Sequence, residues 1–280
     1  MNNSIEIVIV LYQCTLDKSI TFLSLTEQLE NESIDYELVI YNNDKNLKIE
    51  DARFIIVNSE ENKKLEGAYN FALERAIKNG KDWILLLDQD TLIPENYFRE
   101  VEKLFSSNYS PDLVAIVPKL VSEGNIISPV HVSNLMRFEH EINFNGYTNK
   151  RINALNSLSL LKVEFIKSIG GFSKDFPFDL HDHWCYNQIH KHKKLVYVLD
   201  ITTEHESSFI KFEENVSIAR YKEFLSTENK FISQEIGLPV YFFYKMKILM
   251  RSIKQFINYK NKKYAIITFK SFFNFKNYFL

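Results

Sequence analysis

The chain has 280 residues, of which 45% are hydrophobic and 25% charged, so its composition is that of a globular protein and excludes wholesale disorder. Only 7 Gly and 6 Pro are present, which argues against collagen-like and linker-rich chains. The net charge of −2 does not by itself indicate a polyanionic partner, and two cysteines supply neither a disulfide framework nor a zinc motif.

Short apolar runs bounded by polar residues predict strands at residues 5–11, 37–41, 53–58, 83–87, 113–117 and 195–199. Helical spacing of apolar residues predicts helices at 17–32, 64–79, 94–107 and 163–169. Strands that alternate with helices predict an α/β fold with a mostly parallel sheet. Residues 120–160 fit no regular pattern, and 181–192 are predicted as a polar helix or loop.

Polar clusters follow three of the predicted strands, namely Tyr12 and Gln13; Asn42, Asn43 and Asp44; and Asp88, Gln89 and Asp90. Ligands of parallel α/β sheets bind at the carboxyl ends of strands, so these clusters mark the expected site. Two carboxylates at i and i+2, Asp88 and Asp90, can bind one divalent cation, because hard cations prefer oxygen ligands. The alternative is that the two acids cap the next helix or meet solvent.

Five segments, which follow one another along the chain in the family's order, resemble motifs of the family 2 glycosyltransferases. The run L-D-Q-D-T at 87–91 resembles the family's D-x-D metal site and is typical of its rhamnosyltransferase-like branch. The other four are V-I-V-L-Y at 8–12, L-V-I-Y-N-N-D at 38–44, N-K-K-L-E-G-A-Y-N at 62–70 and G-G-F at 170–172. The resemblance covers about residues 5–206 and implies the GT-A fold, a nucleotide-binding α/β sheet. The sequence departs from the family at Asn42, where an aspartate is usual, and at Lys64, where a glycine is usual.

The resemblance also implies a set of site residues. Nucleotide-sugar contacts would come from Tyr12, Asn42, Asn43, Asn70, Asp88 and Gln89. The ligands of a Mg²⁺ or Mn²⁺ ion would be Asp88, Asp90 and His205. The general base that takes the proton of the acceptor hydroxyl would be Asp182, with Asp179 as the alternative. Without the resemblance, Asp179 is interpreted as a helix N-cap and His205 as a surface residue.

Four histidines cluster within twelve residues, at His181, His183, His190 and His192. They form i, i+2 pairs, which do not share one face of a helix, so a zinc site is not expected. Near an acceptor sugar, these rings can hydrogen-bond its hydroxyls.

Residues 240–280 carry a strong charge asymmetry. They contain nine Lys or Arg and no Asp or Glu, so the preceding 239 residues carry −11. The same segment holds 13 of the 40 aromatic residues. A helical, basic and aromatic segment suits a membrane interface with anionic lipid. Packing on the body and a homo-oligomer contact are the alternatives; no nucleic-acid partner is expected, since no binding module is visible.

We therefore expect a GT-A domain at 1–210 and a helical, membrane-associating extension at 211–280. The expected activity is inverting glycosyl transfer from a dTDP- or UDP-linked donor, with L-rhamnose as a candidate sugar. The expected acceptor is a glycan or lipid-linked oligosaccharide of bacterial surface polysaccharide synthesis. No signal-peptide pattern and no run of 18 apolar residues occurs, so we expect a cytoplasmic protein, peripheral on the inner face of the membrane.

Two other functions remain open at this stage. A nucleotidyltransferase would carry a Gly/Arg-rich loop after the first strand, and residues 12–16 lack one. A catalytically degenerate nucleotide-sugar-binding or scaffold protein is compatible with Asn42 and with the altered acidic spacing around Asp182.

Overall fold

The computed structural model describes residues 3–29, 34–133, 138–205 and 216–274. Two compact units are found, one made of residues 1–131 and 139–206 and the other of 132–138 and 207–280. The expected domain boundary at 210, the end of the helix expected at 17–32 and the last six residues of the aromatic tail lie outside the described residues.

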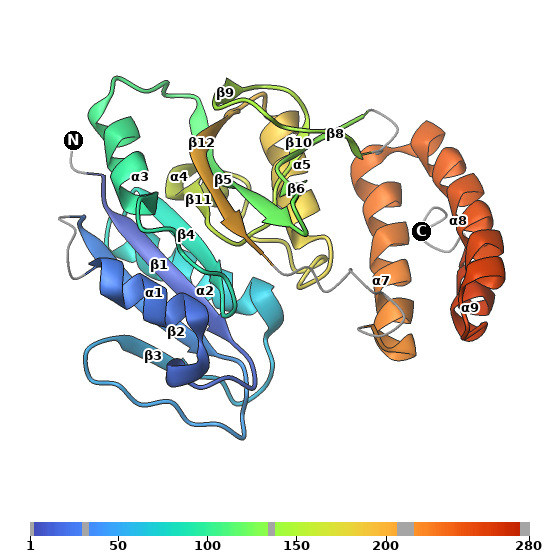
Figure 1. The fold of residues 1–280 in the computed structure, drawn as a ribbon, viewed down its shortest axis with the longest axis horizontal. Coiled ribbons are helices and arrows are strands. Elements are labelled where there is room, and N and C mark those ends of the chain that lie inside the picture. Colours follow the sequence, from blue (N-terminus) through green and yellow to red (C-terminus); the bar gives the residue numbers. More distant parts are fainter. Residues whose placement is uncertain (1–2, 30–33, 134–137, 206–215, 275–280) are drawn as a thin grey trace. The chain divides into compact units, whose positions relative to one another are not determined.

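The first unit is built on a nine-stranded, mostly parallel sheet, which confirms the predicted fold class (Figure 1). Its path runs β3-β2-β1-β4-β11-β5-β12-β9, and β6 pairs with β5. Its strands are β1 Ile5–Leu11, β2 Tyr36–Asn42, β3 Ile55–Asn58, β4 Trp83–Asp88, β5 Leu113–Ser122, β6 Asn125–Ser128, β9 Gly146–Thr148, β11 Ser159–Lys162 and β12 Leu195–Glu204. A second sheet has the order β10-β7-β8, with β7 Val130–Val132, β8 Phe138–Glu141 and β10 Ile152–Asn153.

Helices cover both faces of the large sheet (Figure 1). The helical elements of this unit are η1 Leu16–Lys18, α1 Ile20–Leu29, α2 Lys64–Lys78, α3 Tyr97–Ser106, α4 Val163–Ser168 and α5 His181–Lys191. Successive residues of a strand point to opposite faces. On β1, Ile5, Ile7 and Ile9 therefore join the core formed with α1 and α3, while Glu6 meets Arg75 of α2 on the other face.

The irregular region 120–160 contains the starts of six strands, β6 to β11, that no sequence pattern predicted, and β11 is the one at the centre of the large sheet. β11 lies between β4 and β5 and runs antiparallel to both, with Leu160 opposite Leu85 and Ile116. Four residues directly before a helix give too short a pattern to separate from that helix. The insertion makes the sheet mixed at its centre, while β1 to β4 stay parallel on one side.

Two predicted helix starts are wrong by three residues, for local reasons. The helix expected from Asp17 begins at Ile20, because the hydroxyl of Ser19 accepts a hydrogen bond from the N–H of Phe22 and caps it. The helix expected from Pro94 begins at Tyr97, because the Tyr97 N–H bonds back to the Pro94 carbonyl in a turn.

Glu6 is a fully buried acid far from the polar strand ends, and it makes folding stability depend on pH. Arg75 Nε lies 3.2 Å from Glu6 Oε1, but Glu6 Oε2 is buried without a hydrogen-bond partner among the described residues. Burial, only partly offset by Arg75, raises the pKa of Glu6 to about 7. A raised carboxyl pKa means that the folded state favours the neutral form of Glu6. The contribution of neutral Glu6 to the free energy of unfolding is complete below the unfolded pKa near 4.5 and is lost as pH rises through 7.

We expect Glu6→Gln, which mimics the neutral acid, to be as stable as the native chain at pH 5 and more stable by about 1–3 kcal/mol at pH 8. Urea denaturation at both pH values measures the difference. Glu74→Gln, an exposed change on the same helix as Arg75, is the control and should be neutral at both. A Glu6→Gln protein that is less stable than native at pH 8 would show that the ionised Glu6–Arg75 pair is a net stabilising contact.

The second unit is mostly helical in its described part at 216–274. It contains α7 Ile218–Phe231, a π-helical turn η2 at Ile232–Ile236, α8 Leu238–Asn258 and α9 Lys263–Phe272. The Ser217 hydroxyl caps α7 by accepting from the Arg220 N–H, and Gly237, with φ +108°, separates η2 from α8. Within the described residues, no helix has both the length and the apolarity needed to cross a bilayer.

Candidate active site

The ends of β1 and β4 are joined by the turn that carries the two predicted metal ligands. The Gln89 side-chain oxygen accepts a hydrogen bond of 2.8 Å from the N–H of Tyr12, and the Gln89 carbonyl accepts one of 2.8 Å from the Ser19 hydroxyl. The amide of Gln89 thus fixes the backbone where β1 ends. The ring of Tyr12 remains 47% exposed beside this turn.

The carboxylates of Asp88 and Asp90 lie close enough for their negative charges to repel each other. Neither has a hydrogen-bond or ion-pair partner among the described residues. Burial, with the negative charges of Asp90 and Asp182 adding to it, raises the pKa of Asp88 to about 7. Oxygen ligands that repel one another are stabilised by a divalent cation, so these two side chains fit Mg²⁺ or Mn²⁺.

Asp182 lies in the first turn of α5 with one carboxylate oxygen bound and the other open. Its Oδ1 accepts from the backbone N–H of His183 at 2.8 Å and lies 2.9 Å from the His183 ring Nδ1. Oδ2 has no hydrogen-bond partner among the described residues, and the side chain is 14% exposed. Burial acts to raise the pKa of Asp182, but the charge and hydrogen bonds of His183 outweigh it and lower that pKa. The group is therefore an ionised carboxylate with one oxygen available for a proton.

Electrostatics distinguishes Asp182 from its alternative, Asp179. The charge of Asp182 acts on both Asp88 and Tyr69, so Asp182 lies close to the end of β4. This proximity to the metal-ligand candidates favours Asp182 as the candidate base, and the choice between it and Asp179 stays a prediction.

Asn42 and Asn43 are buried at the end of β2, and their carboxamides serve the fold. The Asn42 amide donates to the backbone carbonyls of Asp44 and Leu47 and to the side chain of Asn58. Asn43 accepts from the Lys63 N–H and donates to the Lys64 carbonyl, both at 2.9 Å. These side chains shape the loops beside the strand end, and their predicted contact with a nucleotide sugar stays a prediction.

The segment at 62–70 joins α2 to the Gly-Gly-Phe segment. Lys64 has φ +58°, a left-handed conformation that glycine adopts most readily, which explains why glycine is usual there. At Gly67 an added Cβ would lie 2.5 Å from the Cβ of Lys63, so no larger residue fits without movement. Asn70 donates to the Phe172 carbonyl and accepts from the Phe172 N–H, both at 2.9 Å. Asn70 therefore holds the backbone near the predicted acceptor side, and a direct sugar contact stays a prediction.

His205 follows β12 and lies next to the D-Q-D turn. Its ring Nδ1 is 3.2 Å from the Thr91 hydroxyl, which also bonds Ser157 Oγ at 2.6 Å. In the part of the chain that the structure describes, no group of three or more His, Cys, Asp or Glu is arranged to hold a metal ion. Asp88, Asp90 and His205 thus do not form a closed cage. This suits Mg²⁺, which is usually bound through one or two carboxylates together with substrate phosphates and waters.

Tyr69, which no sequence pattern assigned to the site, lies beside His181, one of the four clustered histidines. The Tyr69 hydroxyl and the His181 Nε2 are both buried without a hydrogen-bond partner in the described chain. Their rings lie 5.2 Å apart, and the His181 ring also packs on Phe172 at 5.2 Å. Burial lowers the pKa of His181 to about 4, so its ring is neutral at pH 7. Tyr69 lies on the helix predicted at 64–79, and only its unpaired hydroxyl, beside two acids, distinguishes it from an ordinary core residue.

Replacing Tyr69 with phenylalanine should leave stability unchanged or raise it by up to about 1 kcal/mol, because the hydroxyl removed has no partner to lose. If that hydroxyl hydrogen-bonds the bound substrate, kcat/KM should fall about 2- to 10-fold. Tyr186→Phe is the matched control: its buried hydroxyl lies 2.8 Å from Ser159 Oγ, so stability should fall by about 1 kcal/mol. A similar loss of stability in Tyr69→Phe would show that the Tyr69 hydroxyl is bonded in the fold.

A match to known sequences decides the family. Residues 7–169, more than half of the chain, match glycosyl transferase family 2. The chain belongs to glycosyl transferase family 2. This glycosyltransferase thus has the family that the five segments indicated, while its predicted place in the rhamnosyltransferase-like branch is not decided by the match. No curated protein sequence matches the chain.

Two solved structures show that the family 2 chain has the GT-A fold. TarS of S. aureus, residues 1–349, gives a TM-score of 0.51 at 12% identity over 96% of this chain and 80% of TarS 1–349. The mannosyltransferase PcManGT from Pyrobaculum calidifontis, solved with GDP-Man and Mn²⁺, gives 0.50 at 14% identity over 95% and 73%. At these identities the likeness concerns the fold alone.

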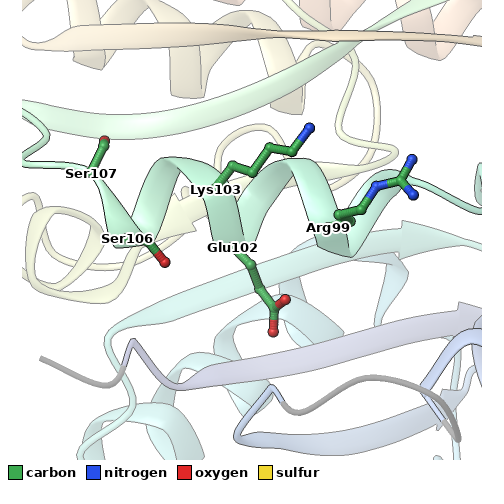
Figure 2. Close-up of a pocket in the computed structure, with 5 residues that line it drawn as sticks. All are labelled: Arg99, Glu102, Lys103, Ser106 and Ser107. Atoms are coloured by element: carbon green, nitrogen blue, oxygen red, sulfur yellow. The ribbon is translucent and has the colours of Figure 1, made fainter.

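A pocket of 480 Å³ in this glycosyltransferase lies away from the D-Q-D turn. Its lining comes from one helix, α3, and the residue that follows it: Arg99, Glu102, Lys103, Ser106 and Ser107. Figure 2 shows these side chains leaving the helix in different directions instead of converging. No second element contributes to the pocket, so the strand-end turn, where charged groups from different elements meet, is the candidate site.

Proposed function

We propose that this glycosyltransferase is metal-dependent and inverting, and that it moves a sugar from a dTDP- or UDP-linked donor to a hydroxyl of a glycan or lipid-linked oligosaccharide. L-Rhamnose is the proposed sugar, supported by the L-D-Q-D-T run. Bacterial surface polysaccharide synthesis is the proposed pathway. One observation carries the catalytic part: the unpaired carboxylates of Asp88 and Asp90 at the end of β4, with Asp182 close by.

Asp182 is the proposed base. Its Oδ2 takes the proton of the acceptor hydroxyl as that oxygen attacks the anomeric carbon. The His183 contacts to Oδ1 hold the carboxylate in place and keep it ionised. The bond to the nucleoside diphosphate breaks on the opposite side of the sugar, so the anomeric configuration inverts.

The leaving group is the part of the reaction that needs positive charge. Asp88 and Asp90 would hold a Mg²⁺ or Mn²⁺ ion, with His205 as a proposed further ligand. The cation, when bound, neutralises charge on the departing diphosphate. The exposed ring of Tyr12 would stack on the nucleobase, while Gln89 fixes the Tyr12 backbone and Asn42 and Asn43 shape the neighbouring loops.

The proposed function also includes a domain organisation and a location at a membrane. We place the domain boundary near residue 210, with 1–210 as the transferase domain and 211–280 as an extension that contacts a membrane surface. The protein would act on the cytoplasmic side, at the inner face of the membrane. Homo-oligomer formation is compatible with this arrangement.

Thermal shift against a panel of nucleotide sugars, with and without Mn²⁺, tests the donor part. One donor should raise Tm, and more strongly with Mn²⁺, because a ligand that binds only the folded state stabilises it. Tyr12→Ala should weaken binding of that donor about 10- to 100-fold if its ring stacks on the base. A chain that no nucleotide sugar stabilises, with or without Mn²⁺, would contradict the proposed function.

A further inference from the structure

Helix α8 buries polar side chains beside Tyr241, Tyr244 and Ile248, and it exposes a set of large apolar side chains, which an ordinary surface helix does not. Lys245, Ser252 and Gln255 are buried on the inner side of the helical unit. Buried polar groups are stable only if they are hydrogen-bonded, and large exposed apolar side chains gain stability when an apolar neighbour covers them.

The inner polar groups are well satisfied by α7 and α9. Lys245 Nζ donates to Asn229 Oδ1 at 2.7 Å and to the Asn274 carbonyl at 2.7 Å. Gln255 donates to the Tyr221 hydroxyl at 2.8 Å and accepts from the Thr268 hydroxyl at 2.6 Å. These bonds connect the three helices, so the inner face of α8 is committed to this unit.

The outer face carries large apolar side chains in two stripes. On α8, seven side chains are each between 54% and 70% exposed: Phe242, Phe243, Met246, Met250, Ile253, Phe256 and Ile257. On α9, which packs beside α8, the exposed apolar residues are Ile266 and Phe269, and Phe273 at the C-cap of α9 is exposed as well. Spacings of three and four residues put most of them on one side of each helix. Exposed large apolar side chains gathered in this way on neighbouring helices mark a contact surface.

The positive charge beside the apolar stripes indicates what kind of surface covers them. Lys254, Lys263 and Lys270 are exposed, and their ammonium groups have no partner among the described residues. Residues 240–280 contain no acid at all. A second copy of the same face would therefore bring two sets of positive charges together, whereas an anionic lipid surface offers both an apolar layer and negative headgroups.

We propose that the outer faces of α8 and α9 lie in the interface of a membrane rich in anionic lipid, with the apolar stripes among the acyl chains and the lysines at the headgroups. This deepens the membrane contact of the proposed function and rests on it. The helices lie in the plane of the interface, since no helix of the described chain has the length and apolarity for crossing.

Flotation of the full chain with vesicles tests this surface, in the absence of any donor. The chain should float with vesicles of phosphatidylcholine and phosphatidylglycerol, and far less with phosphatidylcholine alone or in 1 M salt. Met250→Asp and Ile253→Asp, both at exposed positions, should each weaken binding about ten-fold or more. The triple change Lys254→Glu, Lys263→Glu and Lys270→Glu should abolish the preference for phosphatidylglycerol. Lys222→Glu, an exposed change on α7, is the charge control.

Circular dichroism shows whether each variant remains folded. We expect all of them to fold, because the substituted positions are exposed. A folded native chain that does not float with phosphatidylglycerol vesicles would overturn the proposal. A native dimer that Met250→Asp converts to a monomer would also overturn it, in favour of a contact between copies. Donor binding is measured without vesicles, so failure of this surface and failure of the proposed transfer reaction are read separately.

Discussion

Replacing Asp182 with asparagine should lower kcat by about 10²- to 10⁴-fold, the usual contribution of a positioned general base. Asparagine keeps the size of the side chain and can still accept a hydrogen bond from the His183 N–H, but it cannot take a proton. Donor binding should be unchanged, because Asp182 acts on the acceptor hydroxyl. Initial rates of nucleoside diphosphate release, together with the thermal shift produced by the donor, separate the two effects.

Asp112→Asn is the matched control for this variant. Asp112 is exposed, pairs with Lys194 at 2.6 Å, and precedes β5 at the opposite end of the strand from the site. It should transfer sugar at the native rate. If Asp182→Asn keeps the native kcat while Asp179→Asn loses it, the base is Asp179 and the assignment from electrostatics is wrong.

Replacing Asp90 with asparagine should lower kcat/KM by about 10²- to 10³-fold and remove the additional stabilisation that Mn²⁺ gives to the donor complex. An amide is a weaker and neutral ligand, so the cation loses one of its two carboxylates. Thermal shift with donor, over a series of Mn²⁺ concentrations, reports binding, and rates over the same series report transfer.

Excess Mn²⁺ should restore part of the activity of Asp90→Asn, because Asp88 remains. The same series on Asp112→Asn should match the native chain. If the native protein transfers sugar equally well in EDTA, the two acids serve a different purpose and the metal-dependent part of the account is wrong.

The parallel part of the fold could be predicted because its signals are local. Continuous apolar runs such as Trp83 to Leu87 indicate strands buried on both faces, and the alternation with helices indicates their parallel pairing. Antiparallel β11 could not, because its four residues merge with the start of α4 and its partners lie more than 40 residues away in sequence.

Site residues with a local sequence signal could likewise be predicted, whereas roles that depend on distant contacts could not. The position of Asp88 and Asp90 at the end of a predicted strand made them recognisable as candidate ligands. The family resemblance indicated Asp182 as the candidate base. The amides were harder to interpret, because an asparagine can bind a ligand or hold a loop. Asn70, for example, bonds Phe172, 102 residues away, which no local pattern shows.

The composition shows the charge asymmetry of the C-terminal segment, but it does not show which of the side chains are buried and which are exposed. Tyr241, Tyr244 and Lys245 are buried, while Phe242 and Phe243 between them are exposed. A residue-by-residue list of basic and aromatic side chains does not tell which of them face inward. The hydrogen bonds of Lys245 to α7 and to the end of α9 settle that assignment.

Proton NMR of the sugar first released or transferred from a single pure donor, with Mn²⁺ present, shows whether the anomeric configuration is inverted. We expect nucleoside diphosphate to appear together with a sugar of anomeric configuration opposite to that in the donor, and Asp182→Asn and Asp90→Asn to suppress both signals. Release of the sugar with retained configuration, or binding of the donor with no release from any nucleotide sugar tested, would contradict this expectation.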